Sequence, residues 1–255
     1  MSSLYPISIR HALDLSQPIE LTVDWDSSTE HEASLAAAHA EAIRRFRAHL
    51  VSGAFASRFG GSPCGAEVHQ ATGPNRLRIE FDAYPVEPQS LRLLARAIQY
   101  QHCIRDSRAV ICFSGQPAAA GGAPGGMFTA ADLEQQLTLK AVPFEVHSQW
   151  CYKYLTLELT FGDPLPEALV QALDDAVANW SVLGNLGAYA SSEELDAFDP
   201  DEQMELLLDV PTIGEDFMSW SITQLNVPNQ CVTPLLNMLR AGDPTGVWIR
   251  QARIQ

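Results

Sequence analysis

The fold is decided by two stretches of the chain, Ile19-Glu20-Leu21-Thr22-Val23-Asp24-Trp25 and Leu155-Thr156-Leu157-Glu158-Leu159-Thr160-Phe161. Apolar and polar residues alternate at every second position in both, which predicts strands that bury one face. A shorter strand-like segment precedes each of them, over 5–9 and 142–146. The same pattern of residues therefore begins twice, and this repetition organises the chain.

Each copy continues with a helix, a strand, a second helix and a closing strand. The first copy is expected to place them over 32–50, 77–82, 88–102 and 108–113. The second copy is expected to place them over 166–180, 204–209, 215–225 with 232–239, and 247–250. This order predicts an α+β protein of two related units, each an antiparallel sheet with helices on one face. One continuous sheet is the alternative.

The boundary between the copies is an uncharged run rich in Gly, Ala and Pro, from Ser114 to Gly126, which is typical of a linker. It lacks the Gly-Lys-Ser/Thr ending of a phosphate-binding loop. The expected organisation is a first unit over 1–113, a linker over 114–129 and a second unit over 130–255.

Charge is distributed very unevenly between the two halves. The net charge is −15, yet residues 1–126 carry 12 acidic and 11 basic side chains, whereas residues 127–255 carry 19 acidic and 5 basic ones. Between Tyr154 and Leu239 there are 15 carboxylates and no Lys or Arg. Such a surface repels nucleic acid and anionic membranes and attracts basic proteins. Solubility is the alternative reason for acidity.

The compartment is expected to be the cytoplasm. The first residues lack the basic start and apolar core of a signal peptide, and no apolar run reaches the length that spans a bilayer. The five cysteines, an odd number without a C-x-x-C pair, fit reduced thiols better than disulfides.

Residues that could carry chemistry do not form a catalytic pattern. His102 and Cys103 are adjacent, so on a helix their side chains point about 100° apart and cannot pair. Cys64 lies in a Gly-rich loop with only His69 near it, and no two histidines have metal-ligand spacing. The sequence predicts a non-catalytic protein without metal or cofactor. The alternative is an enzyme whose site, using Cys64, Cys103 or carboxylates, is assembled only by the fold.

The densest acidic run covers residues 191–205, named here the acidic segment. It contains Pro200 and lacks the turn glycine of an EF-hand loop, which argues against a cation site. The remaining interpretations are a solvated loop and a docking surface for Arg and Lys, and the docking surface is preferred. Phe198 within it would serve as an aromatic anchor. The residues expected to bind a partner are Glu193, Glu194, Asp196, Phe198, Asp199, Asp201 and Glu202.

In its size, its doubled element order and its acidic half, the chain resembles immunity proteins of bacterial polymorphic-toxin and type VI secretion systems. In outline it is similar to the immunity protein 52 family, which is associated with restriction-endonuclease-like nuclease toxins. The resemblance implies a cytoplasmic protein that binds and neutralises a cognate toxin domain. A nuclease carries a cationic surface for phosphates, so an acidic inhibitor gains fast association with it. A general interaction adaptor is the further alternative.

Overall fold

The computed structural model describes residues 5–26, 32–52, 68–73, 75–81, 87–119, 127–151 and 153–255. The first unit contains β1 (Ile7–Ile9), β2 (Leu13–Asp14), β3 (Ile19–Trp25), α1 (Glu32–Ser52), β4 (Val68–Gly73), β5 (Arg76–Phe81), α2 (Pro88–Cys103) and β6 (Ala109–Gly115). The connection contains β7 (Met127–Phe128) and α3 (Ala130–Glu134). The second unit contains β8 (Glu145–Ser148), β9 (Lys153–Phe161), α4 (Glu167–Asn185), α5 (Ser192–Asp196), β10 (Glu205–Leu208), β11 (Thr212–Ile213), β12 (Phe217–Leu225), the 3-10 turn η1 (Asn229–Cys231), α6 (Val232–Gly242) and β13 (Ile249–Ile254).

The chain is an α+β protein, and its two main sheets have the same strand order. The first sheet runs β1-β6-β3-β5-β4, and the second runs β8-β13-β9-β12-β10 with β11 beside β12. In each sheet the first two of these strands are parallel and the other neighbours are antiparallel. Because the sheets are separate, the alternative of one continuous sheet is wrong.

Two expectations about individual elements are wrong. The segment 215–225, expected to be helical, contains strand β12, in which Met218, Trp220 and Ile222 alternate with exposed or half-buried residues. The first unit has a further strand, β4, which the sequence pattern did not predict. Each unit is therefore strand, strand, helix, strand, strand, helix, strand, and β10 corresponds in position to β4 and not to β5.

The residues assigned to the linker, 114–129, include parts of strands. Ser114 and Gly115 complete β6, Pro117 forms a bridge with Leu13, and β7 pairs with β2 of the first unit. Helix α3 then packs against α2. Residues 120–126 of this run lie outside the described residues.

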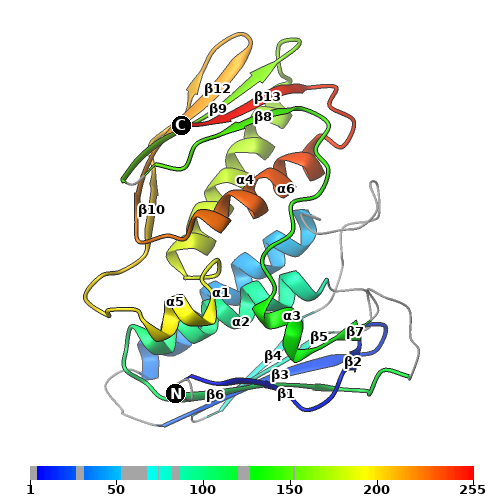
Figure 1. Cartoon of the computed structure of the whole chain (residues 1–255), viewed down its shortest axis with the longest axis vertical. Coiled ribbons are helices and arrows are strands. Elements are labelled where there is room, and N and C mark those ends of the chain that lie inside the picture. The colour runs from blue at the N-terminus through cyan, green and yellow to red at the C-terminus, as the bar shows by residue number, and fades with distance from the viewer. Residues whose placement is uncertain are drawn as a thin grey trace.

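The units are stacked with their helices inside and their sheets outside (Figure 1). Helices α1 and α2 cover the first sheet, α4 and α6 cover the second, and α1 packs against both α4 and α6. The buried side chains of the two units form one hydrophobic cluster. In the described part of the chain, no helix is long and apolar enough to cross a membrane.

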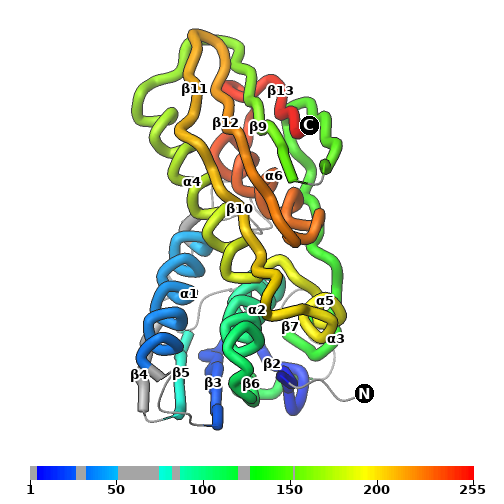
Figure 2. The backbone as a smooth tube through the Cα atoms, turned by 90° about the vertical axis from the view of Figure 1, so that its left-hand side faces the viewer, coloured from blue at the N-terminus to red at the C-terminus, as the bar shows by residue number. Residues whose placement is uncertain are grey.

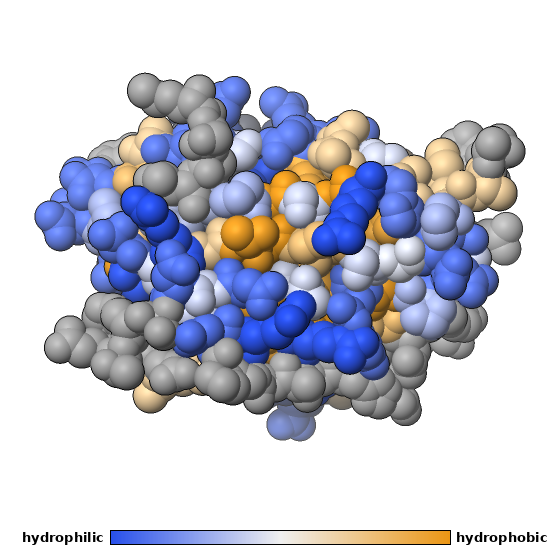
Figure 3. Space-filling model, turned by 90° about the horizontal axis from the view of Figure 1, so that it is seen from below, coloured by the Kyte–Doolittle hydropathy of each residue, from blue (hydrophilic) through white to orange (hydrophobic). Residues whose placement is uncertain are grey.

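Hydrophilic side chains cover much of the outer face of the first sheet and surround a smaller hydrophobic patch (Figure 3). Arg78 of β5 forms ion pairs with Glu20 on the neighbouring strand β3 and with Glu80 on its own strand, and Arg76 pairs with Asp24 of β3. These side chains alternate with buried ones such as Leu21 and Leu77, as expected for a sheet with one face in water.

Candidate functional site

The acidic segment begins with a short helix that its own side chains cap. Ser191 precedes α5, and the Oε2 atom of Glu194 accepts hydrogen bonds from the Ser191 amide at 2.7 Å and from its hydroxyl at 2.8 Å. The Glu194 amide donates in return to Ser191 Oγ at 3.2 Å. This reciprocal capping box, with Glu193 also in the first turn, stabilises the helix N-terminus. Glu194 therefore has a structural task.

The carboxylates of the segment point into solvent. Asp199 holds the next turn, because its Oδ1 accepts the Asp201 amide at 3.0 Å and its carbonyl accepts the Glu202 amide at 2.9 Å. The six acidic residues expected to bind a partner are all exposed: Glu193, Glu194, Asp196, Asp199, Asp201 and Glu202. The structure thus gathers them on one short surface stretch.

Phe198, expected to be a partner anchor, is instead half-buried within the chain. Its ring packs edge-to-face on Tyr100 of α2 with centroids 5.2 Å apart. The Tyr100 hydroxyl in turn accepts the amide of Met204 at 2.8 Å. Gly187 lies against the same tyrosine with a φ of +71°, where a Cβ would be 2.3 Å from the ring. Tyr100 therefore fixes the middle and the C-terminal end of the acidic segment to the first unit.

A second attachment is built on a buried arginine. The Arg96 side chain is 1% exposed, and its Nη2 donates to Glu134 Oε1 at 2.9 Å and to the Leu133 carbonyl at 3.0 Å. Ser192 of α5 donates its hydroxyl to the other oxygen of Glu134. The chain Arg96–Glu134–Ser192 thus joins α2, α3 and α5. Sequence reasoning missed it because arginines on a helix are usually expected in solvent.

The His102-Cys103 pair is separated, as the helix geometry predicts. Cys103 Sγ contacts the Leu195 carbonyl at 3.6 Å, and burial raises the pKa of this thiol to about 11. A thiol that stays protonated at neutral pH is a poor nucleophile. Cys64 and the side chain of His69 lie outside the described residues.

His102 instead meets His39, a contact that sequence spacing could not reveal. Their Nε2 atoms are 3.1 Å apart, and His102 Nδ1 lies 3.3 Å from Ser107 Oγ. Burial lowers the pKa of His39 to about 4, and burial together with His39 lowers that of His102 to about 3. Both imidazoles are neutral at physiological pH and packed beside Trp25. Within the described residues, no group of three or more potential ligands could hold a metal.

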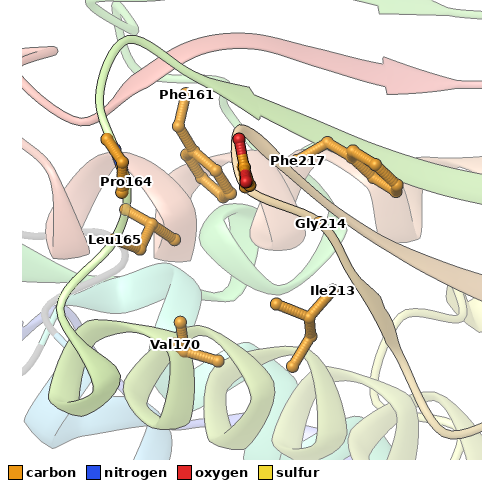
Figure 4. A pocket seen from close by; sticks show the side chains of 8 residues that line it. Phe161, Pro164, Leu165, Val170, Ile213, Gly214 and Phe217 are labelled. Carbon is orange, nitrogen blue, oxygen red and sulfur yellow. The ribbon is translucent and has the colours of Figure 1, made fainter.

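The structure adds a pocket that the sequence analysis did not find. It has a volume of about 140 Å³ and lies between the end of β9, the start of α4 and the β11–β12 hairpin (Figure 4). The apolar side chains around it are Phe161, Leu165, Val170, Ile213 and Phe217, with Glu215 among the lining residues. The sequence feature that could have indicated this pocket is Ile213, an apolar residue directly before the polar turn Gly214-Glu215-Asp216.

The acidic segment and this pocket lie along the same side of the molecule. Figure 2 shows α5, β10 and β11 following one another along the side that faces the viewer. Three side chains on this run, named here the apolar edge, are exposed: Leu207, Val210 and Ile213. Carboxylates therefore alternate with apolar side chains over one continuous edge.

Comparisons with known proteins place the chain in no family. No protein-family model and no curated protein sequence matches it. Among solved structures, a protease from Helicobacter pylori is 10% identical and covers 90% of this chain and 74% of its own, with a TM-score of 0.24. An unknown protein from Galdieria sulphuraria is 9% identical, covering 94% and 96%, with a TM-score of 0.20. Complex III2 from Candida albicans is 8% identical, covering 89% and 70%, with a TM-score of 0.23. Such low scores carry no argument about function.

Proposed function

We propose that the chain is a non-catalytic binding protein whose acidic second unit captures a basic protein partner. The observation that carries the proposal is the stretch from Tyr154 to Leu239, with 15 carboxylates and no Lys or Arg. The exposure of six of the seven carboxylates of the acidic segment supports it, because a buried carboxylate could not meet the Lys and Arg side chains of a partner. The protonated Cys103 thiol argues against the enzyme alternative at that residue.

A toxin domain of the nuclease type is the partner that we infer. A nuclease must carry Lys and Arg side chains to bind phosphates, and covering that surface both speeds association and blocks its substrate. The protein would then act as a cytoplasmic immunity protein, as its outline resemblance implies. The basic character of the partner separates this function from the adaptor alternative, because an adaptor could bind partners of any charge.

The first test is identification of the partner by affinity capture from native cells and mass spectrometry. The expected result is a basic protein whose toxic domain is neutralised when the two are expressed together. A neutral or acidic partner, or a basic partner without toxicity, would contradict the immunity function.

The second test measures association kinetics with that partner. Within the part of the chain that the structure describes, the side chains of Glu193, Asp201 and Glu202 form no hydrogen bond or ion pair, so their reversal to Lys keeps the hydrogen bonds of the capping box and of the Asp199 turn. The triple variant is expected to slow association by about tenfold at low salt, with a smaller effect at high salt. The control is Glu145→Lys, because β8 is the opposite edge of the same sheet from β10. Equal effects of the control and of Asp201→Lys alone would refute a specific surface.

A further inference from the structure

The pocket beside the β11–β12 hairpin is lined mainly by apolar side chains. Phe161, Leu165, Val170 and Ile213 converge on it from β9, the loop before α4, α4 itself and β11 (Figure 4). The ring of Phe217 packs over Gly214, where a Cβ would be 2.2 Å from a ring carbon. An engineered apolar cavity of about 150 Å³ accepts benzene, so about 140 Å³ suits one aromatic ring or branched aliphatic side chain.

Two apolar side chains at or beside this pocket are exposed at the edge of the second sheet. Ile213 of β11 lines the pocket and is 56% exposed, and Val210, in the connection between β10 and β11, is 90% exposed. Edges are normally protected by charges or proline, and Pro211 does interrupt this one between β10 and β11. Pro211 lacks an amide donor, which disfavours the addition of another strand there. What the edge offers a partner is therefore side-chain contact.

The segments that form the pocket carry exposed carboxylates. Glu215 lines the pocket itself, and Asp163, Glu167 and Asp216 are exposed next to lining residues or in the first turn of α4. One basic side chain lies beside these segments, because a Cβ at Gly162 would be 2.4 Å from the Nε atom of Arg250. The rim thus favours a cationic segment, while the interior favours an apolar side chain.

We propose that this pocket binds one large aliphatic or aromatic side chain of the partner, from a segment in which Lys or Arg residues flank it. The inference rests on the proposed function and names the contact that holds the complex. The acidic segment attracts the partner, and the pocket supplies the apolar anchor that Phe198 does not. A buried anchor within a polar rim is the usual arrangement of the residues that dominate an interface.

The test uses a synthetic probe, the capped peptide Lys-Arg-Phe-Arg-Lys, with Lys-Arg-Ala-Arg-Lys as its control. Binding is followed by NMR through the methyl groups of Val170 and Ile213. We expect the Phe peptide to shift these signals and to bind at least about tenfold more tightly than the Ala peptide, because the ring is removed from water. Equal affinities would mean that charge alone binds, and would overturn the pocket, as would the absence of binding.

Two variants make the test specific. Ile213→Ser removes a wall of the pocket and is expected to weaken the Phe peptide by at least about fivefold. Val247→Ser is the matched control, because Val247 is 54% exposed and does not line the pocket. Equal losses in the two variants would also overturn the proposal.

Kinetics with the captured partner separate the pocket from the proposed function. Ile213→Ser is expected to speed dissociation with little change in association, whereas Asp201→Lys slows association. If Asp201→Lys slows association and Ile213→Ser leaves dissociation unchanged, the pocket proposal fails and the proposed function stands. If the captured partner is not basic, the proposed function fails, and the peptide comparison still decides the pocket.

Discussion

Replacing Tyr100 by Phe tests how the acidic segment is held on the first unit. The tyrosine side chain is 1% exposed, and its hydroxyl accepts the amide of Met204, which is itself buried. Phenylalanine keeps the ring contact with Phe198 but leaves that amide without its acceptor. Water cannot easily replace the hydroxyl at this buried position.

The expected cost is that of one buried, unsatisfied amide, about 1–3 kcal/mol of unfolding free energy. For a chain of this size, such a loss lowers the melting temperature by roughly 2–12 °C. Urea denaturation gives the free energy, and hydrogen exchange over residues 198–206 reports the local effect. Exchange there is expected to accelerate, because opening of the segment no longer breaks this hydrogen bond.

The control is Tyr189→Phe. Its hydroxyl is equally buried but donates to the Trp180 carbonyl, 2.9 Å away, within the second unit. This variant should lose stability without selective acceleration of exchange over 198–206. The reasoning is refuted if Tyr100→Phe unfolds with the wild-type free energy, or if both variants change exchange in that segment equally.

Two further predictions concern the packing between helices and the buried histidines. Gly187→Ala is expected to lower the free energy of unfolding by about 2 kcal/mol or more, because it combines a left-handed backbone with a clash against Tyr100. Gly242→Ala should instead stabilise α6 by about 0.5–1 kcal/mol, because a Cβ there meets nothing within 4 Å. Equal stabilities of the two variants in urea denaturation would contradict both expectations. Burial lowers the folded-state pKa of His49 to about 4, below its unfolded value of 6.5, so its contribution to stability is fully present above pH 6.5 and is lost as the pH falls towards 4. The slope of unfolding free energy between pH 6 and pH 4.5 should therefore be about 1 kcal/mol per pH unit smaller in His49→Phe, and identical slopes would exclude a neutral buried imidazole.

The sequence predicted the fold class because both first long strands carry a clear period of two. It failed at β12, although Met218, Trp220 and Ile222 have the same period, because Glu215 and Asp216 before them resemble a helix start. It also failed at β4, since Val68-His69-Gln70-Ala71-Thr72-Gly73 has no apolar alternation. An edge strand pairs with only one neighbouring strand, and the alternation of apolar and polar residues in its sequence is often weaker than in a central strand.

The candidate site could be predicted only in part. Charge composition was enough to find the exposed carboxylates, because it needs no knowledge of contacts. The burial of Arg96 and the half-burial of Phe198 depend on α3 and α5 packing over α2, and these partners lie tens of residues away. The pocket likewise joins three segments that a sequence pattern treats separately.

The strand order that the two sheets share determines when each sheet can be completed during folding. In both sheets the last strand of the unit, β6 or β13, lies between the first two strands. Strand β1 or β8 therefore has no partner until the polypeptide of its whole unit has been synthesised. Contacts of such long sequence separation slow folding, so each nascent unit exposes an unpaired strand edge during translation.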